Sequence, residues 1–600
     1  MSDAPAPTAP PSPEPSAGEP SRSGGVRDTL ESVLIALILA FVFRAFFVEA
    51  FVIPTGSMAT TLYGAHMRFR CEDCGHAFTT NYQTPQVPGS DDIAIPPFAS
   101  VLVRERGPNG AVRDVLRPQV FAIHCPNCGY RVPRNLPNDP DNDATAPPVH
   151  YGDRILVLKY GYLLSPPQRW DVVVFKSPYD QRDSDPPPGR PVTAPEFQQN
   201  YIKRLVGLPG EELMLLDGDV YVRTAQDAGT NTKKKAGKPF SPHGWVVQTK
   251  PRHVQNALWR LVHDNDHQPR GLTRSPDPDY STPWVTPPGA GAFRTEPGGR
   301  VFISEPGTSA ALRFDPDANR RTHALRDFLV FNVTAEQQAG GRNPDQFNFV
   351  ERDPEYVVTD LQLRVTWEKL SGPGDAPLRL MLSKRDQRFV AELTDTTASL
   401  LRVWPDGRTE TLATASIPRG TRRELVFENV DYRVALRVNG REVLATTPQQ
   451  YGPDLVALYA DDAARRQPPL PEVGIEARGH AARLSHLSLW RDVYYSNRTN
   501  QIGHKNPLWG HPDQPIVLAR GSGGRNEYFV LGDNSPLSLD ARFWDDPIRL
   551  PWEDLFVQDG RVPERFLLGK AFYVYWPAGY RPAFLNMGIR PNFGEMRMIH

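Results

Sequence analysis

Apolar residues are concentrated in one run near the N-terminus, VLIALILAFVFRAFFVEAFVI, from Val33 to Ile53. Only Arg44 and Glu49 interrupt it. Because a bilayer span takes roughly 20 apolar residues, the run predicts a transmembrane helix, which we place over residues 28–53. Charges near one end of such a helix are tolerated, because long side chains reach the membrane interface.

A cleaved secretory signal peptide is the alternative for this run. Arg22 and Arg27 precede it, and Val48-Glu49-Ala50 loosely resembles a cleavage site. The run is longer than the apolar core of a typical signal peptide, about 7 to 15 residues, which favours an uncleaved signal anchor. The two arginines then place the N-terminus in the cytoplasm and the chain after the span outside it, at the plasma membrane. Residues 1–27, rich in Pro, Ser, Ala and Glu, are predicted to be a disordered cytoplasmic tail.

After the span, short runs of β-branched and aromatic residues alternate with polar stretches rich in Pro and Gly, a pattern typical of strands. No helical period of comparable strength accompanies them, so the fold class is predicted to be mainly β. The runs are RILVLKYGY (Arg154–Tyr162), WDVVVFKSP (Trp170–Pro178), NYIKRLVGLPGEELMLLDGDVYV (Asn200–Val222), EYFVLGDNS (Glu527–Ser535) and GKAFYVYWP (Gly569–Pro577).

A stricter alternation begins in DLQLRVTWEKL, where every second residue from Leu361 to Trp367 is apolar. This two-residue period is that of a half-buried strand. In YRVALRVNGREVLAT, Asn439-Gly440 between two such runs is a strong hairpin signal. Residues 325–497 therefore resemble a concanavalin-like β-sandwich, or jelly-roll, that we expect to be separable from the rest. Such a sandwich binds a glycan or another surface ligand, or it is a spacer that shapes the molecular surface.

Length and composition add broad limits. The 600 residues suggest three or four structural units, at a prior of about 150 residues each. The formal net charge of -1 gives no electrostatic case for nucleic acid as a partner. The 62 prolines predict many loops. We expect an irregular insertion over 223–324, a linker over 498–520 and a C-terminal tail over 586–600.

All four cysteines of the chain lie in an insertion over residues 63–150, as CEDCG (Cys71, Cys74) and CPNCG (Cys125, Cys128). Two C-x-x-C-G turns let paired thiolates converge on one tetrahedral ion, and each glycine permits the tight backbone that follows. We therefore predict a zinc-ribbon-like insertion with one Zn²⁺, structural because four cysteine ligands leave no open position. Two disulfides are the alternative, which an extracytoplasmic compartment would allow.

One serine lies just beyond the apolar run, Ser57 in FVIPTGSMAT. A lone serine is a weak signal, but YIKRLVGLPGE places Lys203 among apolar residues. Burial there would lower the pKa of the lysine, so that a neutral amine could take the serine proton. The alternative is a lysine that points outward into solvent. The sequence contains no G-x-S-x-G, H-E-x-x-H or G-x-x-x-x-G-K-[ST] motif.

Together these segments resemble the bacterial type I signal peptidases, membrane-anchored enzymes that remove signal peptides with a Ser-Lys dyad. IPTGSM is similar to their nucleophile box, YIKRLVGLPGE to their lysine box and GDNSPLSLDARFW to their last major box. GDRILVLKYGY, RWDVVVFKSP and GKAFYVYWP resemble the family's strands, in the expected order. The resemblance implies a signal-peptidase β-fold catalytic core made of residues 54–62, 151–222 and 521–585.

The resemblance also implies the central catalytic roles. Ser57 is then the nucleophile and Lys203 the general base. The hydroxyl of Thr55 and the backbone N–H of Ser57 form the oxyanion hole. No cofactor is needed for this chemistry.

Supporting roles follow for the last box. By resemblance, Ser538 orients the lysine amine, while Asp540 and Arg542 form a structural ion pair. The chain departs from the family at Ser535-Pro536, where Arg and another polar residue are usual, and this puts the local loop contacts in doubt. Asp533-Asn534 is either a pair of turn residues or a support of the site.

The implied function is the removal of N-terminal signal peptides from exported preproteins by cutting after small residues of the Ala-x-Ala type. Preproteins, membrane lipid and the secretion translocon are the implied partners. The sequence also allows two other classes of protein. A membrane-anchored binding protein with an inert core is disfavoured by the intact Ser57, Lys203 and Ser538. A self-cleaving Ser-Lys peptidase of the repressor type is disfavoured by the apolar span and the lack of a DNA-binding segment.

Overall fold

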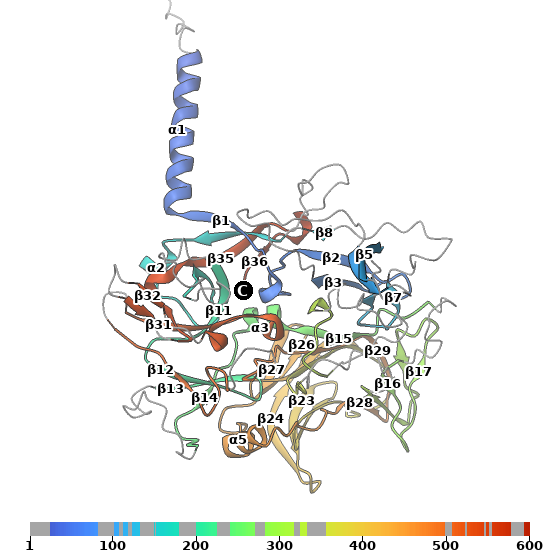
Figure 1. Cartoon of the computed structure of the whole chain (residues 1–600). Coiled ribbons are helices and arrows are strands. Elements are labelled where there is room, and N and C mark those ends of the chain that lie inside the picture. The colour runs from blue at the N-terminus through green and yellow to red at the C-terminus, as the bar shows by residue number, and fades with distance from the viewer. Residues whose placement is uncertain are drawn as a thin grey trace, which may run out of the picture. The chain divides into compact units, whose positions relative to one another are not determined.

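The computed structural model describes residues 25–81, 101–106, 112–117, 123–132, 149–150, 152–178, 200–224, 240–270, 282–316, 325–332, 356–498, 507–521, 525–544, 548–550, 555–557, 559–577 and 593–600. The chain divides into two compact units, one that ends at Glu49 and one that begins at Ala50. The larger unit is mainly β, as predicted, and contains several sheets (Figure 1).

The N-terminal apolar run forms the helix α1, Gly25–Phe46, followed by the strand β1, Val48–Val52. The predicted helix over 28–53 is therefore wrong at its C-terminal end. Val48, Phe51 and Val52 are residue types that favour a strand over a helix, which explains the change. Among the described residues, none of the helices has both the length and the apolar character that a bilayer span requires.

The predicted catalytic core contains two sheets, a larger one and a smaller one. The larger sheet has the strand order β1-β9-β35-β10-β11-β31-β34, with β36 paired to β35. The five runs that were predicted as strands all lie in these sheets, so that prediction is confirmed. The strands are β9 Arg154–Leu158, β10 Val172–Lys176, β11 Asn200–Gly207, β31 Glu527–Leu531, β34 Val562–Pro563, β35 Leu567–Trp576 and β36 Arg597–Met598.

The central strand β10 is buried on both faces. Val173 and Phe175 pack into one apolar cluster, and Val172 and Val174 pack into another on the opposite side. This follows from the two-residue period of a strand, because VVVF offers an apolar side chain to each face. Two packed faces fix the register of the neighbouring strand, and Lys203 of β11 pairs with Val173.

The smaller sheet and the C-terminus correct two of the predicted boundaries. The predicted linker 498–520 contains β30, Ile516–Val517, which pairs with β12, Glu211–Leu216. The order of this sheet is β14-β13-β12-β30, with β13 at Asp219–Thr224 and β14 at Val246–Val247. The predicted tail 586–600 ends in β36, and Ile599 is buried in the core. Strands of two residues are too short to show a periodic pattern, so they could not be predicted.

Two larger sheets form the predicted sandwich, with strand orders β17-β18-β29-β20-β25-β26-β27 and β16-β19-β28-β21-β22-β23-β24. The predicted hairpin at Asn439-Gly440 is confirmed, since it joins two paired strands and both residues have positive φ, 50° and 76°. The later strands are β20 Leu361–Ser371, β21 Leu378–Lys384, β22 Gln387–Leu393, β23 Thr397–Val403, β24 Thr409–Ser416, β25 Arg422–Val430, β26 Arg433–Val438, β27 Arg441–Ala445, β28 Val473–Arg478 and β29 Ala481–Arg491, with the helix α5 at Leu455–Ala463.

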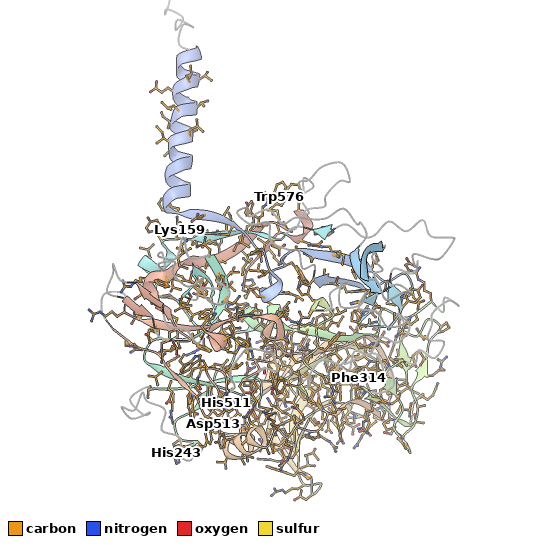
Figure 2. All side chains as sticks on the ribbon, in the orientation of Figure 1. Lys159, His243, Phe314, His511, Asp513 and Trp576 are labelled. Atoms are coloured by element: carbon orange, nitrogen blue, oxygen red, sulfur yellow. The ribbon has the colours of Figure 1, made fainter. Side chains whose placement is uncertain are left out.

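The insertion over 223–324, predicted to be irregular, supplies further strands of the same sandwich. The prediction of an irregular insertion is therefore wrong for the described part of this range. Phe314 packs edge-on against Trp284 with ring centroids 5.3 Å apart, inside the densely packed side chains of the sandwich (Figure 2). After the helix α3 Arg252–Leu258 come β15 Arg260–Asp264, β16 Trp284–Val285, β17 Arg294–Thr295, β18 Phe302–Ile303 and β19 Ser309–Phe314.

The sandwich shares its interior with the predicted catalytic core. Met214 and Leu216 of β12 and Tyr221 of β13 belong to the same apolar cluster as the sandwich core. Lys384 of β21 also contacts Asp219 of β13, with Nζ and Oδ2 3.4 Å apart and both side chains buried. The expectation that the sandwich is separable is therefore wrong.

We expect deletion of the sandwich, residues 260–491 replaced by a short Gly/Ser bridge, to leave an insoluble core. The deletion exposes three apolar side chains, each worth about 1.5 to 3 kcal/mol when buried, and it leaves the buried Asp219 carboxylate without Lys384. Soluble yield and size-exclusion chromatography measure the outcome. A soluble, monodisperse core with native circular dichroism would contradict it.

The cysteine-containing insertion is a separate set of small sheets. Its three-stranded sheet has the order β3-β2-β8. Two separate two-stranded sheets, β4-β5 and β6-β7, lie between β3 and β8 along the chain. The strands are β2 His66–Arg70, β3 Ala77–Asn81, β4 Val101–Arg106, β5 Val112–Arg117, β6 Ile123–His124, β7 Arg131–Val132 and β8 Val149–His150.

Candidate active site

Ser57 lies in a single 3₁₀ turn, η2 Gly56–Met58, that begins shortly after β1. Thr55 caps this turn with an extended backbone, φ -121° and ψ 161°. Ser57 is 8% exposed, so its hydroxyl is largely shielded from water. The turn ends the extended segment and directs the serine side chain toward the sheet that carries Lys203.

Lys203 projects from β11 and meets the serine. Its Nζ lies 2.7 Å from Oγ of Ser57. The side chain is 5% exposed, so the alternative of a lysine pointing into solvent is wrong. Two residues predicted from distant segments are thus in direct hydrogen-bond contact.

Burial lowers the pKa of Lys203 from 10.5 to about 8. The negative charges of Asp540 and Asp533 oppose this by raising the pKa, and the positive charge of Arg542 lowers it further. The desolvation of the ammonium is the larger effect, because a charged amine loses its hydration when it is buried. The amine therefore loses its proton far more easily than a lysine in water does.

The Gly532-Asp533-Asn534 segment holds the serine turn. The backbone N–H of Asn534 donates to the carbonyl of Ser57 at 3.0 Å, and its side-chain amide donates to the carbonyl of Gly56 at 3.0 Å. A Cβ on Gly532 would lie 2.6 Å from the Ser57 carbonyl oxygen, so only glycine allows this approach. Of the two interpretations left open for Asp533-Asn534, the geometry favours the supporting one.

Two buried ion pairs lie near Lys203, close enough for their charges to affect its pKa. Arg204, next to Lys203 on β11, donates through two nitrogens to the Asp533 carboxylate, with both distances 2.7 Å and both side chains fully buried. Arg542 and Asp540 form the second pair at 2.8 Å. Arg542 also donates to Oγ of Ser535 at 2.9 Å, so the unusual residue in the last box is used in a local contact.

The other two predicted site residues have weaker contacts. The hydroxyl of Thr55 lies 3.5 Å from Oγ of Ser57. Ser538 is buried, and its Oγ has no hydrogen-bond partner within the described part of the chain. It lies close to the serine turn, because a Cβ on Gly532 would meet both Oγ of Ser538 and the Ser57 carbonyl.

The four cysteines converge as free thiols. The Sγ atoms of Cys71 and Cys128 are 3.6 Å apart, those of Cys74 and Cys125 are 3.7 Å apart, and all four lie within 4.8 Å of one another. Four thiolates at about 2.3 Å from one tetrahedral Zn²⁺ would be about 3.8 Å apart, so the donor set fits zinc. Burial raises the pKa of the Cys125 thiol, which a bound cation would reverse.

Each cysteine pair has the turn that its sequence predicts. Gly75 and Gly129 follow the pairs with φ of 77° and 75°, in the left-handed region that favours glycine. Their N–H groups donate to the carbonyls of Cys71 and Cys125, at 2.9 and 2.8 Å. The two turns are therefore equivalent in geometry.

Three residues of the insertions that were not predicted contact the serine turn or the segments next to it. Arg260 donates to the carbonyl of Ala59 at 3.2 Å. Asn332 exchanges two side-chain hydrogen bonds with Asn534, at 2.9 and 2.7 Å. Phe331 packs where a Cβ on Gly56 would be, 2.4 Å from its ring. None of them lies in a motif, and only the tertiary fold brings them to the site.

Comparison with known proteins gives one family match. Residues 137–267 match the family described as signal peptidase, peptidase S26, and this segment contains Lys203 and β9 to β13. Signal peptidase I from Pseudomonas aeruginosa is 43% identical over 91 residues, 15% of this chain and 26% of that protein. Probable signal peptidase I-2 from Synechocystis sp. is 34% identical over 76 residues, 13% of this chain and 30% of that protein.

The chain spans about a quarter of the length of the curated relatives that it matches. Among solved structures, the carbohydrate binding module CBM66 from Bacillus subtilis aligns with 35% of this chain and 95% of that chain, at 11% identity and a TM-score of 0.21. A score this low carries no argument about fold or ligand.

A buried serine in contact with a buried lysine lies on a mainly β scaffold, and the lysine lies within the segment that matches peptidase S26. Over residues 137–267 the chain is thus similar to the signal peptidase family, and the curated relatives that it matches are signal peptidases I. These matches agree with the resemblance to the signal peptidases that the sequence boxes indicate.

Proposed function

We propose that this chain is a serine endopeptidase that removes N-terminal signal peptides from exported preproteins, with Ser57 as nucleophile and Lys203 as general base. One observation carries the assignment of roles, the 2.7 Å contact between Nζ of the lysine and Oγ of the serine in a buried setting. A nucleophile and a base within hydrogen-bond reach are the requirement for covalent catalysis by a hydroxyl.

In the first step, the neutral amine of Lys203 takes the proton of the Ser57 hydroxyl while Oγ attacks the scissile carbonyl carbon. The carbonyl oxygen becomes an oxyanion, which the Thr55 hydroxyl and the backbone N–H of Ser57 would stabilise by hydrogen bonds. As the tetrahedral intermediate collapses, the C–N bond breaks and the lysine ammonium gives its proton to the leaving amine. An ester between Ser57 and the signal peptide remains.

In the second step, the neutral lysine takes a proton from water, and the hydroxide formed attacks the ester carbonyl. The C–O bond to Ser57 breaks, and the ammonium returns the proton to the serine oxygen. In this mechanism Ser538 would orient the lysine amine. Its buried hydroxyl, unpartnered within the described residues, supports that role, because it is free to bond a moving amine.

The proposed substrate and location follow from the chemistry of signal peptides, whose cleavage site follows an apolar segment. The large apolar side chains of α1 from Leu30 to Leu39 are 50% to 65% exposed, which suits burial in lipid or against a membrane partner. We assign the catalytic unit to the outer side of the plasma membrane and the N-terminus to the cytoplasm. The secretion translocon would deliver the preprotein.

The test of the proposed function is cleavage of a preprotein by the detergent-solubilised chain. We expect one new N-terminus directly after an Ala-x-Ala site, identified by N-terminal sequencing, and no cleavage by Ser57→Ala. A folded wild-type chain that leaves several preproteins intact would contradict the proposal. Membrane sedimentation of the full chain after an alkaline carbonate wash tests the location separately.

We expect the cleavage rate to rise with pH through about 8, because Lys203 must be neutral to act as base and burial lowers its pKa to about 8. At pH 7 about one amine in ten is then neutral, against about one in 3,000 for a lysine with the usual pKa of about 10.5. Below pH 8 the rate should fall about tenfold per pH unit. If kcat/KM does not change between pH 6 and 8, this role for the lysine is contradicted.

We also propose that Cys71, Cys74, Cys125 and Cys128 hold one Zn²⁺ as a structural ion. The supporting observation is the convergence of four free, buried thiols at separations that fit a tetrahedral site. We expect about one zinc per chain by metal analysis, and loss of most of it in Cys125→Ser. A chain with less than about 0.1 zinc and no free thiols would favour the disulfides instead.

A further inference from the structure

One arginine from the inserted segment β15 reaches the loops on both sides of the serine. Arg260 is 4% exposed. One of its terminal nitrogens donates to the hydroxyl oxygen of Thr60 at 2.8 Å. The other donates to the backbone carbonyls of Ala59 and Asp533, each at 3.2 Å. A single guanidinium thus joins the segment that follows Ser57 to the segment that holds it.

The charge of Arg260 makes this arrangement costly. Among the described residues, no carboxylate forms an ion pair with Arg260, and its Nε has no hydrogen-bond partner. Burial correspondingly lowers the pKa of the guanidinium. A buried cation that forms no ion pair is unfavourable for folding. If this position only had to fill space in the fold, an apolar side chain would stabilise it more. The carbonyl contacts point to a role in fixing the loop.

The other end of the same segment is held by the cysteine turns. Asn127, between Cys125 and Cys128, donates to the carbonyls of Asp264 and His267 at 3.1 and 2.9 Å. Its side-chain oxygen accepts from the backbone N–H of Asp264 at 2.7 Å. The buried side-chain amide of Asn127 is therefore hydrogen-bonded to the backbone that begins four residues after Arg260.

The first cysteine turn contacts this segment as well. His267 bonds the carbonyl of Cys74 through Nδ1 at 3.2 Å. The carboxylate of Asp73 accepts from the backbone N–H of Arg270 at 2.8 Å. Both cysteine turns thus hold the segment from 264 to 270, and that segment is continuous with β15.

We propose that Arg260 is a positioning residue for Ser57 and that the two cysteine turns, through Asn127 and Asp73, hold β15 in the place where Arg260 can act. The inference rests on the proposed function for its kinetic consequence. The inserted cysteine unit then serves the catalytic site by fixing the backbone of the nucleophile turn. Displacing a reacting group by about 1 Å lowers a rate on the order of 100-fold, so small loop movements matter.

The kinetic test compares Arg260→Met with Arg294→Met. Arg294 lies on β17 of the same sandwich and its side chain is 67% exposed, so it serves as the matched control. We expect Arg260→Met to lower kcat for a short signal-site peptide about 10- to 100-fold, with KM changed less than about threefold, since only the serine is displaced. Arg260→Lys should recover part of kcat, because an ammonium can still donate to one or two of the oxygens. Wild-type kcat in a folded Arg260→Met chain would overturn the proposal.

A second measurement does not depend on turnover. Hydrogen–deuterium exchange should rise in the peptides that contain residues 56–62 and 531–535 of Arg260→Met, and stay unchanged in the distant strands β22 and β23, Gln387–Leu393 and Thr397–Val403. If the wild type cuts no preprotein but this exchange pattern appears, the proposed function fails and the positioning role stands. Unchanged exchange in both peptides overturns the positioning role whatever the activity.

A double-mutant cycle tests the connection to the cysteine turns. Asn127→Ala should raise exchange in residues 56–62 and lower kcat in the wild-type background, and it should add little in the Arg260→Met background. Equal effects of Asn127→Ala in both backgrounds would show that the cysteine turns do not act through Arg260, and that half of the proposal would be withdrawn.

Discussion

Lys203→Arg should abolish cleavage, lowering kcat/KM by at least about 10⁴-fold, although charge and length are nearly conserved. The reason is chemical: the guanidinium does not lose its proton in a protein, so it cannot accept the proton of Ser57 at 2.7 Å. Lys203→Met should be equally inactive. The measurement is the cleavage of one preprotein by purified variants, with circular dichroism to confirm that each is folded.

Two further variants separate the base from the rest of the site. Ser57→Ala removes the nucleophile and should match Lys203→Arg, because residues that act as one unit give effects that do not add. Thr55→Ala should keep measurable activity, since loss of one oxyanion donor costs about 10²- to 10³-fold. Appreciable turnover by a folded Lys203→Arg chain would show that another group is the base, and the Ser-Lys mechanism would have to be withdrawn.

The local patterns of the sequence were enough to predict the strands around the site. Val172 to Phe175 form an unbroken apolar run, and such a run fits a central strand buried on both faces. The cysteine pairs were equally informative, because a C-x-x-C-G turn is a short-range structure that glycine alone permits. In both cases the information needed lies within a few consecutive residues.

The contacts from the insertions could not be predicted in this way. Arg260 and Asn332 lie 203 and 275 positions after Ser57 in the numbering, and neither belongs to a periodic pattern or a motif. Their positions depend on how β15 and the turn η3, Val330–Asn332, pack against the serine turn. The predicted N-terminal boundary of the sandwich, residue 325, was wrong for a related reason. The strands β16, β17 and β18 before it have two residues each and show no alternation.

The Arg204–Asp533 ion pair depends on both local sequence and tertiary fold. Its removal should give the second large effect that we expect. Asp533 lies in a recognisable box and Arg204 directly follows Lys203, but only the fold joins them, with both side chains fully buried. Asp533→Asn leaves the Arg204 cation buried with no carboxylate in this pair. Breaking a buried pair from one side typically costs about 3 to 5 kcal/mol, and we expect the free energy of unfolding to fall by that amount. Glu305→Gln is the matched control, because its ion pair with Arg294 has both side chains 67% exposed and should contribute at most about 1 kcal/mol.

The same variant has a catalytic signature with a defined sign. The charge of Asp533 raises the pKa of Lys203, so its removal should bring that pKa below about 8 and shift the rising limb of the rate profile to lower pH. The amine would then be neutral in a larger share of molecules at pH 7, even though the folded state is less stable. Denaturant unfolding and the pH dependence of kcat/KM, both at a temperature where the variant remains folded, measure the two effects independently. A loss of stability below about 1 kcal/mol, no larger than that of Glu305→Gln, would show that the Asp533 carboxylate does not neutralise the Arg204 cation in the folded chain.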